Sequence, residues 1–177
     1  MTIIFIQIDK TGDDILNQGY SVIVAKNLKK IYYYRIPNKI KEKLIGEFHQ
    51  GVFNIDTTSK TKSKLRFKIR FHTACAILII KEIIKGQEKK EDIALNVCND
   101  FDSHIHEIKE MLYSNLTKYI PKIKREKINR AKFSRDSSIS VASRNIFNKR
   151  KKETKNYKHI NLDIQELRNI IEKKKKR

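Results

Sequence analysis

The sequence is poor in three features that would each point to a particular class of protein: cysteines, long apolar runs and acidic residues. Its two cysteines, Cys75 and Cys98, both lie inside apolar segments, which predicts small core residues. With no further cysteines there is no disulfide framework and no zinc motif of paired cysteines. We therefore expect no disulfide-linked partner and a reducing, cytoplasmic setting.

Apolar runs in this sequence are short. No stretch of about 18 uninterrupted apolar residues occurs, so we expect no segment that spans a membrane. Residues 1–8 are apolar, but they include Gln7 and have no basic leader. This start therefore predicts a buried strand and not a signal peptide.

Acidic residues are half as numerous as basic ones, with 20 Asp and Glu against 40 Lys and Arg. Residues 1–117 hold 19 basic and 14 acidic residues, a net charge of +5, whereas residues 118–177 hold 21 and 6, a net charge of +15. Such a surplus exceeds what solubility requires and favours a polyanion, because basic side chains release counterions from phosphates. An anionic membrane surface fits less well, since the tail has few of the large apolar residues that an interfacial helix needs.

The length of 177 residues suits one domain with an extension. We expect a domain over residues 1–148, followed by a lysine-rich linker and a C-terminal helix over residues 149–177. Pro37 ends the third predicted strand, because proline cannot donate to a β-ladder. Asp163 and Glu166 form a capping pair at the start of the last helix. The predicted strands cover residues 2–9, 19–25, 31–36, 93–98 and 128–133, and the predicted helices cover residues 40–48, 68–85, 105–116, 139–147 and 164–171.

Two of these segments have a distinctive composition. Residues 68–85 are apolar all round in their central turns, which predicts a helix buried on more than one side. Residues 50–66 are rich in Thr, Ser and Lys, and they predict an exposed basic loop or a minor hairpin.

Three local strings carry a resemblance to a known fold. The first is IIFIQID, which ends on Asp9; the second is the hairpin GYSVIVAKNLKKIYYYRI; the third is ALNVCNDFDSHIHEI, which contains Asp100 and Asp102. Together with the order of the elements, they resemble the ribonuclease H-like fold over residues 2–148. The resemblance implies an α/β fold with a mixed five-stranded sheet, in which three leading antiparallel strands precede alternating helices and strands, with helices on both faces.

The resemblance also implies an activity. Ribonuclease H-like enzymes cut phosphodiester bonds with two divalent ions held by carboxylates, and Mg²⁺ or Mn²⁺ suits such ligands because hard cations prefer oxygen. By resemblance Asp9 is the first ligand. For the second, Asp102 precedes a serine as is common there, whereas Asp100 is closer to the end of the apolar strand. In an extended segment both would share a face, so we expect Asp9, Asp100 and Asp102 to be catalytic.

Two positions depart from the family's pattern. Its long buried helix usually has a glutamate near the start, but here no carboxylate occurs between residue 70 and Glu82. The helix over residues 139–147 offers hydroxyl groups, with Asp136 just upstream as a substitute metal ligand and Asp163 as an alternative. A site with few carboxylates binds Mg²⁺ weakly. A non-catalytic RNA- or DNA-binding protein, or a basic subunit of a ribonucleoprotein particle, is therefore an open alternative.

Basic clusters supply the expected contacts to RNA, DNA or an RNA–DNA hybrid. No motif that reads sequence is present, so contacts to the phosphate backbone are expected, and the oligomeric state is left open. The residues expected to bind nucleic acid are Lys60, Lys62, Lys64, Arg66, Lys122, Lys124, Arg125, Lys149, Arg150, Lys151 and Lys152.

Aromatic residues and histidines have competing interpretations. Tyr32, Tyr33 and Tyr34 alternate across a strand, which predicts core on one face and wet surface on the other, with base stacking as the functional alternative. His72 predicts a core or interface histidine. His104 and His106 would diverge by about 200° on a helix, which favours two surface histidines over a metal site.

Overall fold

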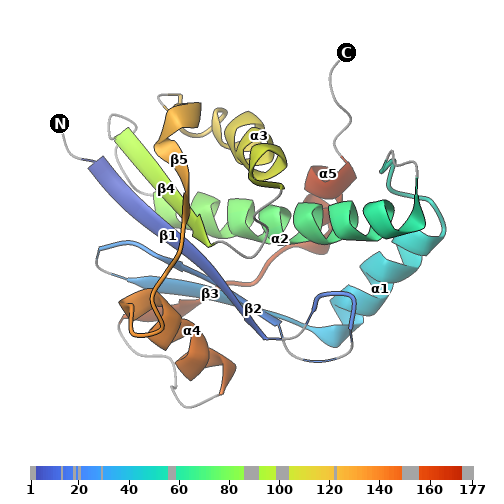
Figure 1. Cartoon of the computed structure of the whole chain (residues 1–177), viewed down its shortest axis with the longest axis horizontal. Coiled ribbons are helices and arrows are strands. Elements are labelled where there is room, and N and C mark those ends of the chain that lie inside the picture. Colours follow the sequence, from blue (N-terminus) through green and yellow to red (C-terminus); the bar gives the residue numbers. More distant parts are fainter. Residues whose placement is uncertain are drawn as a thin grey trace.

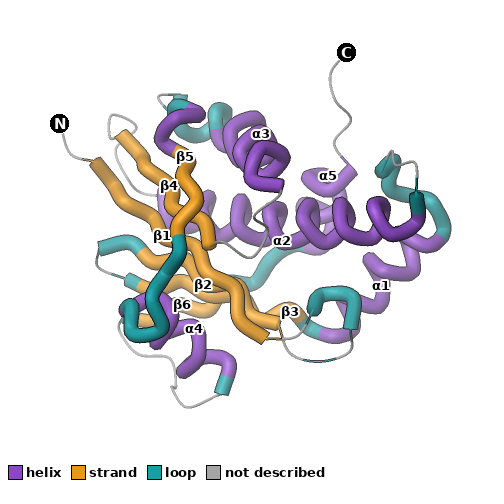
Figure 2. The backbone as a smooth tube through the Cα atoms, in the orientation of Figure 1, coloured by secondary structure: helices purple, strands orange, loops and turns teal. Residues whose placement is uncertain are grey.

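The computed structural model describes residues 3–12, 14–17, 19, 21–28, 30–55, 59–85, 92–98, 104–121, 123–148 and 156–172. The described residues form one α/β unit in which a mixed sheet lies between helices (Figures 1 and 2). The strands are β1 (Ile3–Gly12), β2 (Ser21–Lys26), β3 (Ile31–Ile36), β4 (Asp92–Cys98), β5 (Ile128–Ala131) and β6 (Tyr157–His159). The helices are α1 (Asn38–His49), α2 (Lys60–Ile84), α3 (Ile105–Leu116), α4 (Ser138–Phe147) and α5 (Ile164–Glu172), with a short 3-10 helix over Arg125–Lys127.

The sheet has six strands in the order β5-β4-β1-β2-β3-β6. The first three strands pair antiparallel in sequence, as the hairpin pattern predicts. β4 then pairs parallel with β1, and β5 pairs parallel with β4. β1 and β4 are therefore interior strands, with a strand on each side, and their apolar runs fit that burial.

Alternating residues of β1 face two different layers. Ile6 and Ile8 enter the larger core, which α2, α3 and α5 cover. On the other face, β1 and β2 contact α4, and Val22 and Val24 join Ile139 in a smaller core there. Because side chains alternate along a strand, Gln7, Asp9 and Thr11 lie on the α4 side of the sheet.

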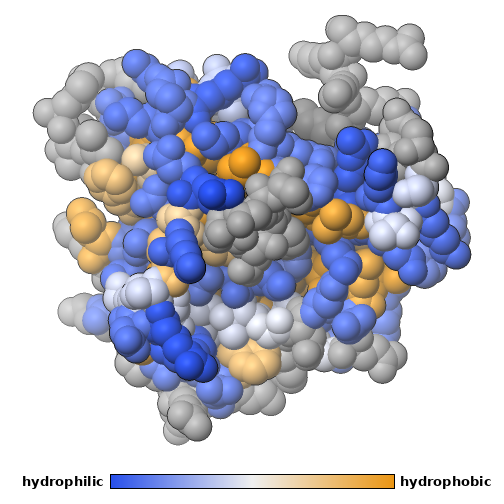
Figure 3. All heavy atoms as spheres, viewed as in Figure 1, coloured by the Kyte–Doolittle hydropathy of each residue, from blue (hydrophilic) through white to orange (hydrophobic). Residues whose placement is uncertain are grey.

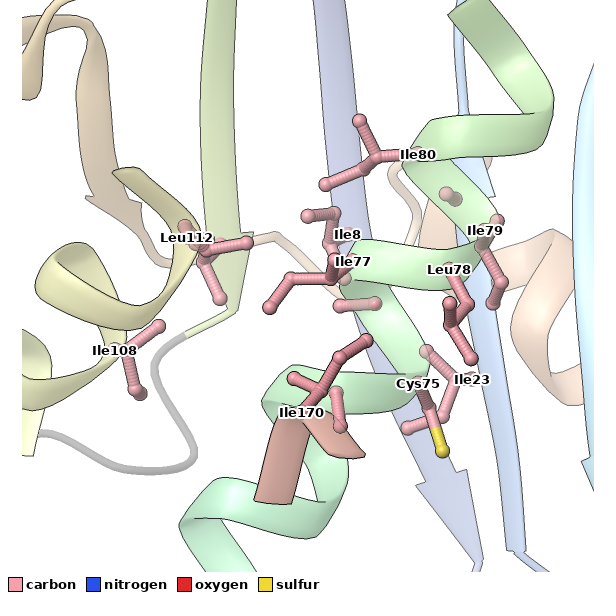
Figure 4. Packing of buried hydrophobic residues seen from close by; sticks show 14 of the residues in the cluster. Ile8, Ile23, Cys75, Ile77, Leu78, Ile79, Ile80, Ile108, Leu112 and Ile170 are labelled. Carbon is pink, nitrogen blue, oxygen red and sulfur yellow. The ribbon is translucent and has the colours of Figure 1, made fainter. Parts of the chain in front are cut away.

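Helix α2 forms the centre of the larger core. Every residue from Phe71 to Ile80 is buried, because α2 crosses the sheet on one side and contacts α3 and α5 on the other. Figure 4 shows side chains of α2, among them Ile77 and Leu78, gathered with Ile8 of β1, Leu112 of α3 and Ile170 of α5 in this core. The prediction of a helix buried on more than one side is confirmed.

The prediction for residues 50–66 is wrong in its second half, because α2 begins at Lys60. The Ser59 hydroxyl accepts a hydrogen bond from the Lys62 backbone N–H at 3.3 Å, as helix-capping serines do. The first two turns are mostly exposed, so they lack the apolar stripe by which a helix is recognised in a sequence.

The sheet also has one strand more than the five expected. β6 pairs parallel with β3 through Tyr32, opposite Lys158, and it falls in the segment interpreted from sequence as a linker. Three residues are too few for an alternating pattern to be visible. The following helix, α5, packs on α2, and Asp163 caps it by accepting from the Glu166 backbone N–H at 2.7 Å.

The sequence predicted neither a membrane-spanning segment nor a disulfide, and the described residues bear on both predictions. None of the helices described here combines the length and the apolar character needed to cross a bilayer. Cys75 and Cys98 are both buried and both free. Burial raises the pKa of the Cys75 thiol, so this thiol stays protonated in the core.

A buried lysine fixes the connection between β1 and β2. Lys41 of α1 is only 1 % exposed. Its Nζ donates to the Gly19 carbonyl at 2.7 Å and to the Ser21 hydroxyl at 2.9 Å. A third contact, to the Asn17 carbonyl, is 3.5 Å long. Buried polar groups need such partners, so Lys41 ties α1 to the start of β2.

We predict that Lys41→Met lowers the free energy of unfolding by about 1–3 kcal/mol, because it takes this donor away from the buried Ser21 hydroxyl and the half-buried Gly19 carbonyl. Urea denaturation would measure the loss. Lys43→Met, an exposed neighbour on the same helix, is the matched control and should change stability by less than about 0.5 kcal/mol. Equal stability of the two variants would contradict the role assigned to Lys41.

Candidate functional site

Asp9 lies in an interior strand of the sheet, on the side of α4. It pairs with Val24 of β2 and is only 9 % exposed. Two residues further along β1, the Thr11 hydroxyl accepts a hydrogen bond from the Ser143 hydroxyl of α4 at 2.7 Å. Asp9 is therefore nearly buried within a strand that continues past it to Gly12, and it is not a solvated residue at the end of a strand.

The end of β4 lies beside Asp9. Ile8 pairs with Val97, so the next residues along the two parallel strands, Asp9 and Cys98, are neighbours at the same level of the sheet. Asp100 and Asp102 follow Cys98 by two and four residues in the chain, and both lie outside the described residues. The register thus brings Asp9 to the end of the strand from which the two predicted partners follow.

The two substitute acids occupy different sides of the sheet. Asp136 is exposed in the turn before α4, and the Ser137 hydroxyl caps that helix by accepting from the Ser140 N–H at 3.3 Å. Ser138, at the start of α4, accepts a hydrogen bond from the Lys26 ammonium. Lys26 lies on the α4 side of the sheet, as Asp9 does, so Asp136 precedes a helix on the same side as Asp9. Asp163 instead caps α5 on the opposite side, so the alternative that α5 completes the acid cluster is wrong.

The described residues alone do not form a metal site. Among them, no group of three or more His, Cys, Asp or Glu side chains converges closely enough to hold an ion. His104 directly precedes α3 and His106 lies in its first turn, where the side chain is exposed. Of the predicted ligands, Asp9 lies in an interior strand of the sheet. One carboxylate alone binds a hard cation weakly, because such ions need several oxygen ligands.

A small cavity of about 30 Å³ lies where β1 and β4 meet α2 and α3, and Asp9 and Cys98 are among the residues that line it. That volume is roughly one water's share of the liquid, so the cavity has no room for a nucleotide. His72 and Thr73 of α2 also line it, and Asp9 is the carboxylate among its lining residues. Most of the other lining residues are apolar, so the cavity is a small extension of the core beside Asp9.

His72 is neutral in this environment. Burial, with a smaller contribution from the positive charges of Lys10, Lys41 and Lys68, lowers its pKa to about 3, against the opposite effect of Asp14. A buried imidazole with so low a pKa does not take up a proton near neutral pH. The prediction of a core histidine agrees with its burial.

Acidic partners neutralise part of the basic surface of α2. Glu107 of α3 pairs with Arg70 at 3.4 Å and with Arg66 at 3.8 Å. Lys68 forms an ion pair with Asp14. Burial raises the pKa of Asp14, but the hydrogen bonds from Lys68 and from the Leu16 backbone outweigh that effect and hold it below its ordinary value. These pairs hold the β1–β2 connection, α2 and α3 together.

Three lysines at the start of α2 differ from these residues. Lys60, Lys62 and Lys64 are exposed, and none of the ion pairs between described residues involves them. Of the other residues predicted to bind nucleic acid, Lys124 is exposed, and Arg125 pairs with Glu110 at 3.0 Å. The remaining predicted contacts, at Lys122, Lys149, Arg150, Lys151 and Lys152, lie outside the described residues.

The prediction that the tyrosines of β3 face a wet surface on one side is wrong. Tyr32 and Tyr34 enter the larger core, and Tyr33 enters the smaller core beneath α4, where it is 5 % exposed. The Tyr33 ring contacts His159 edge-to-face, with ring centroids 5.1 Å apart. Because helices cover β3 on both faces, none of these rings offers a free face for a base.

Sequence reasoning missed two further features. Lys41 shares a helix face with Leu44, Ile45 and Phe48, so a lysine in an apolar stripe was the signal that could have identified it. A hollow of about 210 Å³ between α2, α3 and α5 had no such signal, because its lining comes from three separate elements. It is lined by Ile77, Lys81, Asn115, Lys118, Tyr119, Glu166, Asn169 and Ile170.

Comparisons with known proteins add no family assignment: no family model, curated protein or solved structure matches the chain significantly.

We predict that stability falls as the pH is lowered from 6.5 towards 4. The pKa of His72 is 6.5 in the unfolded chain and about 3 in the folded one. Below pH 6.5 His72 therefore binds a proton in the unfolded state but stays unprotonated in the folded state. This lowers the free energy of unfolding by about 1.4 kcal/mol per pH unit, while above pH 6.5 the effect vanishes. Urea denaturation at several pH values would measure it.

His72→Leu should flatten this dependence between pH 6.5 and 4. The matched control is His106→Leu, which removes an exposed histidine and should leave the slope as it is in the parent chain. A slope in the His72 variant that equals that of the parent would show that other groups carry the pH dependence.

Proposed function

We propose that this chain is a nucleic-acid-binding protein of ribonuclease H-like type that hydrolyses phosphodiester bonds next to Asp9. The observation that carries the proposal is the position of Asp9: in an interior strand, nearly buried, beside the end of the parallel strand β4. Carboxylates delivered by adjacent strands to one region of a sheet are how such folds hold divalent ions.

The order of strands supports this proposal. Without β6, the sheet reads β5-β4-β1-β2-β3, with three antiparallel strands followed by two parallel ones. The resemblance implies three leading antiparallel strands, then alternating helices and strands, with helices on both faces. In support, α2 and α4 lie on opposite faces of the sheet.

The electrostatic character of the chain supports a phosphate backbone as the partner. The formal net charge is +20. At the start of α2, Lys60, Lys62 and Lys64 are exposed and lie outside the ion pairs that connect described residues. Arg66 and Arg70, one and two turns later, reach Glu107 at the start of α3. The basic first turns of α2 are thus connected through Arg66 and Arg70 to α3. α3 is the helix that follows β4, and β4 is the strand beside Asp9.

A metal would depend on acids beyond the described residues. Mg²⁺ or Mn²⁺ would need Asp9 together with Asp100 or Asp102, and would serve to activate water and stabilise the leaving oxygen. The described residues present no complete set of ligands. The second candidate function is therefore binding without cleavage, favoured by His72 and Thr73 standing where the family's pattern has a glutamate.

Asp9→Asn tests hydrolysis directly. We expect the parent chain to cut labelled RNA, DNA or an RNA–DNA hybrid in the presence of Mn²⁺, and the variant to lose activity by at least about a hundredfold, because the amide removes a ligand charge. Gel electrophoresis of products, with and without Mn²⁺, would measure cleavage. Binding without any cleavage by the parent chain would refute the nuclease and leave the non-catalytic function.

Glu42→Gln is the matched control, since it removes an exposed acid of α1 that belongs to no candidate site. Asp136→Asn is a separate test: if it loses activity as Asp9→Asn does, Asp136 also belongs to the site. Thermal melting of each variant would show whether a loss reflects unfolding.

We further predict that changing Lys60, Lys62 and Lys64 together to Gln weakens binding to duplex DNA and reduces the salt dependence of the affinity. Three lost phosphate contacts would lower the magnitude of the slope of log K against log salt by up to about 2.7. Fluorescence anisotropy at several salt concentrations would measure this.

The control changes Lys85, Lys118 and Lys158 to Gln. These exposed lysines follow the far end of α2, follow α3 and lie in β6, so the net charge falls equally at other places. Equal slopes for the two triple variants would show that net charge alone, and not the start of α2, governs binding.

A further inference from the structure

A row of polar side chains crosses the α4 side of the sheet. Gln7 pairs with Lys26 of β2 on one side and with Asn96 of β4 on the other, and Asn96 pairs with Asn129 of β5. Paired residues of adjacent strands point to the same face. Lys26, Gln7, Asn96 and Asn129 therefore form one line over four strands, about 5 Å apart at each step.

Among the helices that the structure describes, none covers β4 and β5 on this side of the sheet. α4 contacts β1 and β2, whereas β4 and β5 lie beyond it towards the edge of the sheet (Figure 1). Interior strands of α/β sheets are normally apolar on both faces because helices cover both. Here Gln7 and Asn96 are half-buried and Asn129 is exposed, so the amide row faces a surface that water reaches.

An exposed aromatic ring lies beside the row. Phe5 is two residues before Gln7 on the same face, and at 49 % exposure it is far more open than Ile6 and Ile8 of the same strand. It pairs with Ala94, whose small side chain leaves the ring uncovered on that flank. Figure 3 shows hydrophobic atoms at the edge of the molecule where β1 begins.

Cations surround this surface. Lys26 ends the amide row at β2, and the segment from β5 to α4 carries exposed Lys132 and Arg135. That segment runs on the same side of the sheet, because Phe133 packs against the smaller core beneath α4. Exposed aromatic rings with amides and cations around them suit an unpaired base, its hydrogen-bonding edge and its phosphate.

We propose that the α4 side of β1, β4 and β5 is a platform for single-stranded nucleic acid, with Phe5 stacking on a base and Gln7, Asn96 and Asn129 contacting base edges. This rests on the proposed function and narrows it to strands whose bases are unpaired. Phe5, Gln7 and Asp9 follow one another on the same face of β1, about 7 Å apart at each step. A strand lying along β1 therefore leads to Asp9.

The first test uses Phe5→Ala in the full chain, with anisotropy measured on single-stranded and duplex oligonucleotides of one sequence. We expect the affinity for single-stranded RNA or DNA to fall about tenfold or more, the usual effect of losing one stacking ring. Duplex affinity should stay within about twofold, because paired bases have no free face. Val141→Ala, which changes an exposed apolar residue of α4, is the matched control.

The second test uses the absence of tryptophan from the chain. Phe5→Trp should restore single-strand affinity and introduce one indole whose emission is quenched when a base stacks on it. Leu28→Trp, at an exposed position in the β2–β3 turn, should show no comparable quenching.

The outcomes separate the two proposals. No binding to any nucleic acid refutes the proposed function and the platform together. Binding that Phe5→Ala leaves unchanged, or Phe5→Trp emission that a bound strand does not alter, refutes the platform alone. Oligonucleotides of RNA and of DNA distinguish the two sources of unpaired bases.

Discussion

The burial of α2 against the sheet is the interaction on which the rest of the structure depends. Ten consecutive residues of this helix, from Phe71 to Ile80, are buried, and β1 meets them with Ile6 and Ile8. Because a strand alternates, fixing these isoleucines in the core fixes Gln7, Asp9 and Thr11 on the opposite face. A slip of one residue in the pairing would put the carboxylate into the apolar core, which is strongly unfavourable. Packing on one face of the sheet thus determines where the candidate chemistry lies on the other.

The two faces of the sheet then have different roles. On the α2 side, the polar groups that are buried serve the fold: Lys41 holds the β1–β2 connection, and His72 stays neutral beside a small cavity. On the α4 side, helix covers only part of the sheet, and polar residues line the interior strands from Gln7 to Asp9. Buried polar groups with partners stabilise a structure, whereas polar groups on an open sheet can contact a ligand. This contrast directs attention to the α4 side.

Charge acts on a longer range than these contacts. Glu107 and Asp14 neutralise Arg66, Arg70 and Lys68, so these residues hold elements together and their charge is largely compensated. The lysines of the first turns of α2 have no such partners among the described residues. The residues that attach α2 to its neighbours and the lysines proposed to contact phosphate are therefore different residues of one helix. Position along the helix separates them, because only its start extends beyond the core.

Apolar periodicity and Pro37 were enough to predict most of the elements and the burial of α2, and the hairpin segment and the order of the elements indicated a mixed sheet. The sequence also indicated Asp9 at the end of an apolar run. Tertiary structure alone decided that Tyr33 is covered, that Asp163 caps a helix on the opposite side, and that β6 joins the sheet. It also decided which basic residues of α2 pair with acids. Coverage, pairing and cross-strand rows depend on residues far apart in the chain, and local periodicity carries no information about them.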